Sequence, residues 1–279
     1  MKRTKHFESD RATLYLVATP IGNLDDMTFR AINTLKSVDK IYCEDTRTSR
    51  TLLEHYQIDK PLDSYHDHNK TTKQHHILND LRSGLSIALI SDAGTPLISD
   101  PGYSVVNLVK ESGFVVVSIP GPSAFLTGLS VSALPTHPFI FYGFLPTKSS
   151  KLKTACEGLR KEPYTLIFYE SPHRINSTLE TLYHVFGDRK VVIARELTKR
   201  YEETISGTLK ELQDLPPLKG ELVLILEGFQ DEPKDQEVNL LDEVYALIDQ
   251  GVSSKEAIKV IAKRHDLPKN DVYQLYHKT

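Results

Sequence analysis

The chain lacks tryptophan altogether and has only two cysteines and two methionines among its 279 residues. Cys43 and Cys156 lie far apart and form no Cys-x-x-Cys pair, which argues against a disulfide scaffold and against a structural zinc site. No apolar stretch approaches the ~20 residues that a membrane helix needs. The first ten residues are basic without a following apolar segment, so we expect no secretory signal. These absences predict a cytoplasmic protein with no membrane segment.

A strong excess of charge is also missing, because the formal net charge is −3. Nucleic-acid binding favours a basic surface, so any RNA would have to be bound by local patches. One such patch is predicted near the end of the chain. Between residues 251 and 279, six lysines and arginines stand against three acidic residues.

Three apolar runs in the first half of the chain are each followed by a loop rich in Gly, Pro, Ser or Asp. The loops are Thr19–Asn23, Ser91–Gly102 and Pro120–Ala124. The carboxyl ends of parallel strands meet at one edge of a sheet, where open α/β folds bind ligands, so we expect these loops to converge. A long structural turn is the alternative for the central loop, since Asp-Pro-Gly and Gly-Thr-Pro are ordinary turn formers.

The order of apolar segments predicts an α/β fold in three parts. Strands alternate with helices in residues 1–132, as in a parallel sheet with crossover helices. Residues 133–230 contain five strand candidates with few helices between them, which favours a mixed sheet and a cleft between the two domains. Residues 231–279 begin with a polar linker at 231–237. Three short amphipathic helices follow it and resemble a helix-turn-helix unit.

The three loops, together with Tyr169–Arg174 and Ala194–Thr198, resemble those of the tetrapyrrole methylase superfamily. The resemblance is strongest to its RNA-methylating branch. It implies a homodimer that uses S-adenosylmethionine to methylate the ribose 2′-hydroxyl of a cytidine in 16S rRNA, with the 30S ribosomal subunit as partner and no DNA. The chain has Ser91-Asp92-Ala93 where the tetrapyrrole enzymes commonly have Gly-Asp-Pro. The resemblance therefore does not specify the backbone conformation just beyond Asp92. The Gly-x-Gly-x-x-Gly fingerprint of the more common methyltransferase fold is absent, as the resemblance implies.

The cofactor site is predicted from the loop chemistry and from the resemblance. Small residues let the backbone approach an adenosine, and N–H groups at a helix start suit an anionic carboxylate. Carboxylates can accept hydrogen bonds from ribose hydroxyls or from an ammonium group. The predicted cofactor-binding residues are Pro20, Gly22, Asp92, Ala93, Gly94, Thr95, Asp100, Pro120, Gly121, Ser123, Ala124, Tyr169 and Ala194.

The catalytic residues are less well specified, because no spacing rule identifies a general base. We compare Glu44, Asp100, Glu170 and Glu196, and place Glu170 first because it lies where a strand leaves toward the expected cleft. The catalytic prediction is Glu170, Glu44 and Arg174. An alternative for the Glu44–Arg47 segment is that Asp45 or Thr46 caps a helix.

Basic residues in three segments are predicted to bind RNA: Lys148, Lys151, Lys199, Lys263, Arg264 and Lys269. The alternatives are a solvated helix start for the first two and surface salt bridges for Arg174, Arg195 and Lys199. His66, His68, His75 and His76 lack the spacing of a zinc site, so no metal is predicted. Two other functions remain open. One is methylation of a tetrapyrrole or another small metabolite, and the other is a ligand-sensing DNA regulator.

Overall fold

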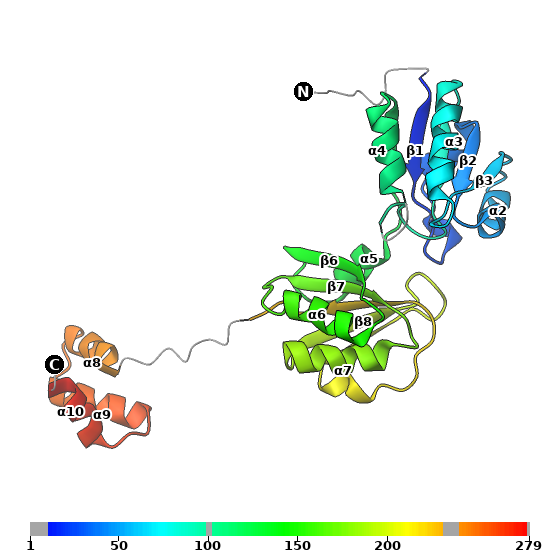
Figure 1. The fold of residues 1–279 in the computed structure, drawn as a ribbon. Helices are drawn as coiled ribbons and strands as arrows, with labels where there is room; N and C mark the ends of the chain where they lie inside the picture. Colours follow the sequence, from blue (N-terminus) through cyan, green and yellow to red (C-terminus); the bar gives the residue numbers. More distant parts are fainter. Residues whose placement is uncertain (1–10, 99–101, 231–239, 278–279) are drawn as a thin grey trace. The chain divides into compact units, whose positions relative to one another are not determined.

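The computed structural model of the protein describes residues 11–98, 102–230 and 240–277 (Figure 1). The chain forms two compact units, Met1–Phe229 and Gln230–Thr279. In its described part, the first unit contains two five-stranded sheets. Residues 1–10, for which no secretory signal was expected, and the predicted linker 231–237 lie outside the described residues.

The first sheet has the strand order β3-β2-β4-β1-β5, and each of its four pairings is parallel. The parallel sheet predicted for this half is therefore confirmed. Because the strands run the same way, the loops that follow them leave at one edge of the sheet. The strands are β1 (Thr13–Val17), β2 (Lys40–Cys43), β3 (Leu62–Ser64), β4 (Ile87–Ile90) and β5 (Val115–Ile119).

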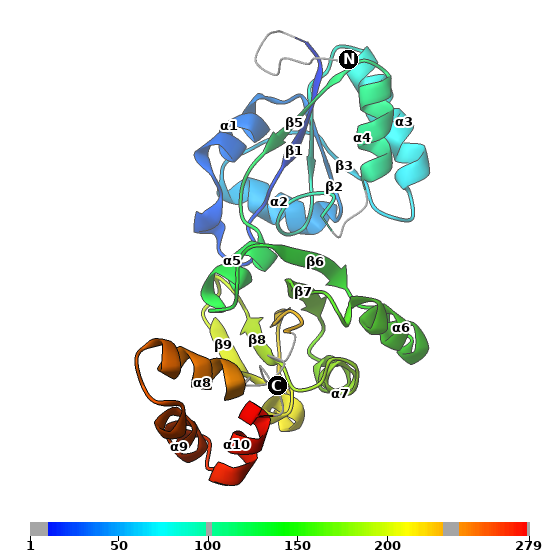
Figure 2. The ribbon, with the colours of Figure 1, turned by 90° about the vertical axis from the view of Figure 1, so that its left-hand side faces the viewer.

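Helices cover both faces of this sheet (Figure 2). Alternate residues of β1 point to opposite faces, as the pleat of a strand requires. Val17 packs with α1 and α2, whereas Leu14 and Leu16 pack with α3 and α4. The helices are α1 (Phe29–Ser37), α2 (Thr46–His55), α3 (Lys70–Arg82) and α4 (Tyr103–Glu111).

Three residues before α1 are of types that commonly cap helices: Asp25, Asp26 and Thr28. Asp25 and Asp26 lie in the 3-10 turn η1 (Leu24–Asp26). Thr28 caps α1 instead, with its Oγ1 accepting a hydrogen bond from the Ala31 N–H at 3.1 Å. Asp and Thr are both good caps, so composition alone could not choose between them.

The second sheet has the order β6-β7-β10-β8-β9 and is mixed. Only β6 and β7 are parallel, and the other three pairings are antiparallel, which confirms the predicted mixed sheet. The strands are β6 (Phe139–Phe144), β7 (Thr165–Glu170), β8 (Lys190–Arg195), β9 (Glu203–Thr208) and β10 (Leu222–Leu226).

Each face of the second sheet has its own apolar core. Helices α6 (Ser149–Leu159) and α7 (Ile175–Phe186) cover one face, with η2 (Glu211–Asp214) beside α7. Helix α5 (Ala124–Val131) covers the other. Ile21, from the loop after β1, is buried in the same cluster as α5. The loop of the first sheet is thus anchored in the core of the second.

The C-terminal unit is described over residues 240–277 and contains three helices. Their apolar faces meet in a small core that includes Val244, Ile258, Ile261 and Val272. Ser253 caps α9, and its side chain accepts a hydrogen bond from the Glu256 N–H. The helices are α8 (Leu240–Asp249), α9 (Ser254–Arg264) and α10 (Lys269–His277).

The predicted fold class is confirmed: two α/β sheets with a helical unit after them. Among the helices of the described residues, none combines the length and apolar character needed to cross a membrane.

The exits of β1 and β5 touch at Ala18 and Gly121, and this contact gives a first test. A Cβ at Gly121 would lie 2.8 Å from the Ala18 Cβ, closer than two carbons can approach. We expect Gly121→Ala to lower the free energy of unfolding by about 1–3 kcal/mol through overpacking. Urea denaturation measures this change. Adding Ala18→Gly removes the opposing methyl group, so the double variant should lose less stability than the two single changes together. Simple additivity would contradict the contact.

Candidate functional site

A cavity of about 430 Å³ lies where the loops of the first sheet meet one edge of the second. This volume is within the range of small-molecule sites. From the first sheet's loops and α5 it is lined by Ile21, Glu44, Asp92, Ala93, Gly94, Thr95, Ile98, Ser123 and Ala124. From the second domain it is lined by Phe144, Tyr169, Glu170, Ser171, Pro172, Leu197, Gly220, Glu221, Leu222 and Val223.

The floor of the cavity is fixed by a pair of backbone hydrogen bonds between Thr19 and Gly94. The Thr19 N–H donates to the Gly94 carbonyl at 2.9 Å, and the Gly94 N–H donates back at 3.0 Å. The Thr19 hydroxyl donates to the Ser91 carbonyl at 3.0 Å. Thr19, Ser91 and Gly94 are buried. The loops after β1 and β4 are therefore held together, as the sequence predicted for strand exits on one edge.

Helix α5 begins at the cavity wall. Ser123 is its N-cap, but the Ser123 side chain makes no capping hydrogen bond. Since the first N–H groups of a helix have no partner within it, the start of α5 offers donors and a positive dipole end beside the cavity. Ser123 and Ala124, both predicted for the cofactor, line the cavity here.

The segment after β2, Glu44–Arg47, was considered from the sequence either for the catalytic site or for helix capping, and its residues divide between these two roles. Asp45 caps α2 by accepting a hydrogen bond from the Arg47 N–H at 2.8 Å, and its carboxylate also pairs with the Arg47 guanidinium at 2.8 Å. The capping alternative therefore accounts for Asp45 and Arg47. Glu44 differs, because it lines the cavity and no group in residues 11–98, 102–230 or 240–277 hydrogen-bonds to its carboxylate.

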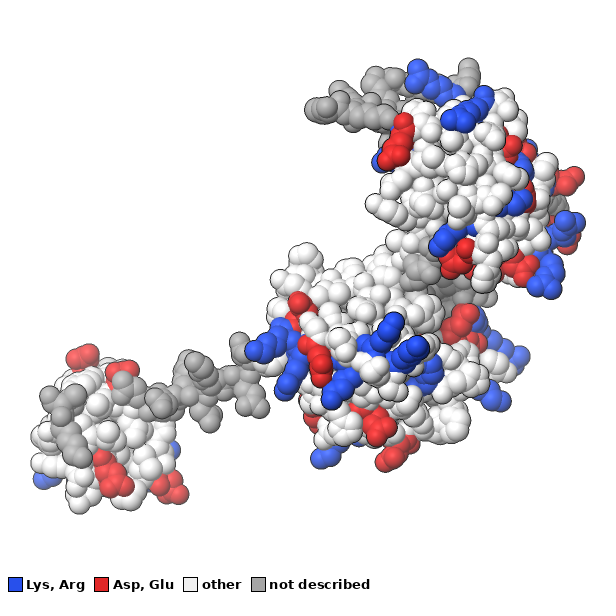
Figure 3. All heavy atoms as spheres, in the orientation of Figure 1, with Lys and Arg blue, Asp and Glu red and all other residues white. Residues whose placement is uncertain are grey.

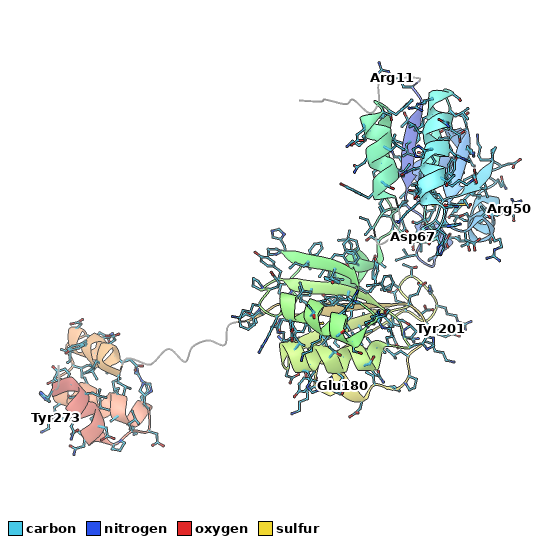
Figure 4. The ribbon with its side chains drawn as sticks, in the orientation of Figure 1. Arg11, Arg50, Asp67, Glu180, Tyr201 and Tyr273 are labelled. Carbon is cyan, nitrogen blue, oxygen red and sulfur yellow. The ribbon has the colours of Figure 1, made fainter. Side chains whose placement is uncertain are left out.

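Glu44 and Asp92 form an electrostatically linked pair on the cavity wall. Burial raises the pKa of Glu44, and the negative charges of Asp92 and Asp67 raise it further, while His66 opposes them. Asp67 stands on the loop between β3 and α3 (Figure 4). Partial burial also raises the pKa of Asp92. The Asp45 N–H, which donates to Asp92 Oδ1 at 3.1 Å, lowers this pKa, whereas the negative charge of the Asp45 carboxylate raises it further.

Glu170, placed first as a base from the sequence, has both carboxylate oxygens engaged. Oε1 accepts from the Ser171 N–H at 2.7 Å, and Oε2 accepts from the Thr178 hydroxyl at 2.7 Å. Arg174 lies 3.5 Å from Oε2 and donates to the Pro146 carbonyl at 3.1 Å. Glu170 lines the cavity, but Arg174 does not. These contacts give Glu170 and Arg174 a structural task in holding the β6–α6 and β7–α7 loops.

Several predicted residues do not line the cavity. Ala194 is buried in the core beneath Tyr169, and Gly121 packs on Ala18. Lys199 lies against Gly22 and pairs with Glu196 and Glu221 at 2.9 and 3.0 Å. The salt-bridge alternative thus accounts for Lys199, and Arg195 likewise pairs with Glu203. The other residues of this group are Pro20 and Pro120, and Asp100 lies outside the described residues.

The remaining basic residues are at two surfaces. Lys148 and Lys151 are exposed at the start of α6. In the C-terminal unit, Lys263 and Lys269 are exposed, whereas Arg264 pairs with Glu243 at 2.8 Å.

The sequence reasoning missed the wall formed by Gly220–Val223. It looked for sites at the carboxyl ends of strands, but this wall includes the beginning of β10. Because β10 is antiparallel to β7 and β8, Leu222 is opposite Glu170 and Arg195, at their carboxyl ends. Only the antiparallel pairing places it there, and pairing direction is not encoded in one strand's pattern. Phe144 was also missed, although it lies at the carboxyl end of β6, and carboxyl ends of strands are where the site was expected.

The sequence model of the family described as Tetrapyrrole (Corrin/Porphyrin) Methylases matches residues 13–213. The chain belongs to the tetrapyrrole methylase family. The chain shares its fold with two solved structures of low sequence identity to it. One is the uroporphyrin-III-C-methyltransferase from Thermus thermophilus (15% identity, TM-score 0.56, 77% of this chain and 94% of that chain). The other is the cobalt precorrin-4 methyltransferase (17% identity, TM-score 0.57, 76% and 94%).

Two relatives are more similar to this chain in sequence than the solved structures are, and both have the same name. The chain is 47% identical over 279 residues to "Ribosomal RNA small subunit methyltransferase I" of Bacillus subtilis (strain 168), which covers 97% of this chain and 96% of the relative. It is 46% identical over 272 residues to the protein of the same name from Haemophilus influenzae, covering 94% and 95%.

The raised pKa of Glu44 predicts a stability difference that depends on pH. The Glu44 carboxyl binds its proton more tightly in the folded state than in the unfolded chain. Protonation of Glu44 therefore contributes its full stabilisation of the fold below the ordinary pKa of 4.5. This contribution is lost as the pH rises through the pKa of the folded state. Glutamine cannot ionise. Glu44→Gln should therefore be more stable than wild type at pH 7 and nearly equal to it at pH 4.

Urea denaturation at the two pH values measures this difference. Glu54→Gln, which changes an exposed glutamate of α2, is the matched control. A Glu44→Gln variant that is less stable than wild type at pH 7 would show that the carboxylate makes a favourable interaction in the folded state.

Proposed function

We propose that this protein transfers a methyl group from S-adenosylmethionine to the ribose 2′-hydroxyl of a cytidine in 16S rRNA, acting as a cytoplasmic homodimer on the 30S ribosomal subunit. The observation that carries the proposal is the 47% identity, over almost the whole of both chains, to a relative named as a small-subunit rRNA methyltransferase. The solved tetrapyrrole methyltransferases are only 15–17% identical, which favours RNA over a tetrapyrrole as the substrate.

The cavity residues fit S-adenosylmethionine. The apolar side chains of Ile21, Leu197 and Val223 suit an adenine ring, and the uncapped start of α5 suits the cofactor's carboxylate. Asp92 is a carboxylate that can accept from the ribose hydroxyls or the ammonium group. When bound, the cofactor supplies a methyl group activated by a positively charged sulfur.

A ribose hydroxyl is a poor nucleophile until a base takes its proton. Glu44 is the better candidate for this base, because its carboxylate is on the cavity wall and is not engaged by any described residue. Its raised pKa also makes it a stronger proton acceptor than an ordinary glutamate. Glu170 has both oxygens committed to Ser171 and Thr178. We therefore assign the proton transfer to Glu44 and a structural role to Glu170.

Methylation of 30S subunits with labelled cofactor tests this assignment. Wild type should label 16S rRNA and yield 2′-O-methylcytidine in a nuclease digest analysed by mass spectrometry. Glu44→Gln should lower kcat by ~10²- to 10⁴-fold, the usual contribution of a general base, and leave the cofactor Kd nearly unchanged.

Glu170→Gln is the control for the alternative base. It should lower thermal stability but leave kcat within a fewfold of wild type. A large fall in kcat for Glu170→Gln alone would reverse the assignment, and a methyl group on a base atom would defeat the proposed chemistry.

RNA contact is proposed at two basic surfaces. Figure 3 shows Lys and Arg side chains gathered on the face of the first unit that carries α6, whose start has Lys148 and Lys151. In the C-terminal unit, Lys255, Lys259 and Lys263 follow one another at four-residue spacing along α9 and are exposed. Side chains at this spacing share one side of a helix. No acidic side chain in the described residues pairs with these three lysines, so they remain available to phosphates.

The same unit also carries an exposed aromatic ring. Tyr273 on α10 is 49% exposed (Figure 4). Aromatic rings can stack on unpaired bases, while lysines bind the phosphates beside them.

Salt dependence tests the α9 lysines. Replacing Lys255, Lys259 and Lys263 by alanine should weaken binding of 16S rRNA and reduce the slope of log K against log salt by about 2, since each phosphate contact contributes ~0.7 with single strands. The same replacement of the exposed Lys36, Lys161 and Lys210 of the first unit is the charge-matched control. Equal slopes for the two triple variants would show that α9 has no special part in RNA binding.

A further inference from the structure

An aromatic side chain at the edge of the cavity is exposed to solvent. Phe144, the last residue of β6, lines the cavity, yet 60% of its surface is open to solvent. Single exposed rings also occur elsewhere on this chain, as at Phe29, but Phe144 differs from them because it lines a cavity, where an exposed apolar surface is open to a ligand. The proposed roles of Glu44, Asp92 and α5 leave Phe144 without a function.

Phe144 is rigidly supported on its inner side. Its ring contacts Tyr169 edge-on, with ring centroids 5.4 Å apart. Tyr169 meets Phe141 at 5.0 Å, and Phe141 stacks on Phe125 at 4.3 Å. Phe144 is thus the outer member of a row of four aromatic rings.

The backbone that follows Phe144 is also held in place. Leu145 is buried in the core beneath α6 and α7, and the Arg174 guanidinium donates to the carbonyls of Leu145 and Pro146. A ring supported on one side and fixed by its neighbours loses little conformational freedom when a flat ligand covers its exposed side.

We propose that Phe144 stacks on the base of the nucleotide whose ribose is methylated. This inference rests on the proposed function, because it concerns how an RNA nucleotide enters the same cavity. A ribose within a stacked strand cannot bring its 2′-hydroxyl into a cavity unless the nucleotide leaves its neighbours, and enzymes acting on extruded nucleotides hold the base by stacking. Phe144 supplies that stacking surface at the rim. Exposed Lys148 and Lys151 follow it in the chain and can hold the flanking phosphates.

Substitutions at Phe144 test the proposal through the kinetics of 30S methylation. Loss of one base-aromatic stacking contact corresponds to about a 10- to 100-fold fall in kcat/KM. We expect this fall for Phe144→Ala and also for Phe144→Leu, which keeps an apolar side chain but no ring. Phe144→Trp should stay within about threefold of wild type. The Kd for S-adenosylmethionine, measured by calorimetry, should be the same in all of them.

Tyr142 provides a matched control two residues earlier on β6. It is 40% exposed and does not line the cavity, and its ring is beside Phe168, which belongs to the core on the other face of the sheet. Tyr142→Leu should leave kcat/KM close to wild type. Because the chain has no tryptophan, Phe144→Trp and Tyr142→Trp each contain a single tryptophan, whose fluorescence can be excited apart from that of the tyrosines. A short cytidine-containing oligoribonucleotide should quench the first and leave the second unchanged.

Three results would overturn the proposal. Full activity of Phe144→Leu would show that no ring is needed. A weaker cofactor Kd in Phe144→Ala, with an unchanged KM for 30S subunits, would place the ring against adenine. Conversion of a dimer to a monomer in sedimentation would place it against a second copy of the chain. Failure of the proposed function itself would be visible separately, as wild-type protein that methylates no rRNA.

Discussion

The cavity depends on the buried backbone pairing of Thr19 with Gly94. Two hydrogen bonds join these residues, and the Thr19 hydroxyl adds a third to Ser91. An unsatisfied buried polar group costs about 1–3 kcal/mol, so the loops after β1 and β4 cannot separate without losing several such bonds. Gly94 adopts φ +77°, a left-handed conformation that a residue with a side chain rarely tolerates. The glycine thus lets the loop turn back toward β1 just where the cavity floor is needed.

The same loop also couples the first sheet to the second. Two residues after Thr19, Ile21 is buried in the core that α5 forms with the second sheet, and it also lines the cavity. Lys199 lies across Gly22 and pairs with Glu196 and Glu221 on the far side. Apolar burial and ion pairing therefore act on adjacent residues of one loop. This is why residues from both domains form the walls of one cavity.

Sequence patterns predicted those features that are set locally. Apolar runs followed by Gly, Pro and Asp indicated the strand exits, and Asp92–Thr95, Ser123 and Ala124 do line one cavity. The distinction between Glu44 and Glu170 could not be made, because it depends on a hydrogen bond from Thr178, eight residues away on α7. Likewise, Leu222 reaches the cavity only through the antiparallel pairing of β10. Both cases were decided by contacts between separate elements, which the pattern of a single strand or helix does not encode.

Both sides of the cavity combine ionic and apolar groups. The first domain supplies the carboxylates of Glu44 and Asp92 and the uncapped N–H groups of α5, together with the apolar side chains of Ile21 and Ile98. The second supplies the rings of Phe144 and Tyr169 and apolar side chains such as Leu197 and Val223, together with the carboxylates of Glu170 and Glu221. Most acidic side chains nearby are engaged, as Asp45 is by Arg47 and Glu196 by Lys199. Glu44 is left on the wall with its charge disfavoured, and a carboxylate in that condition gains most by accepting a proton.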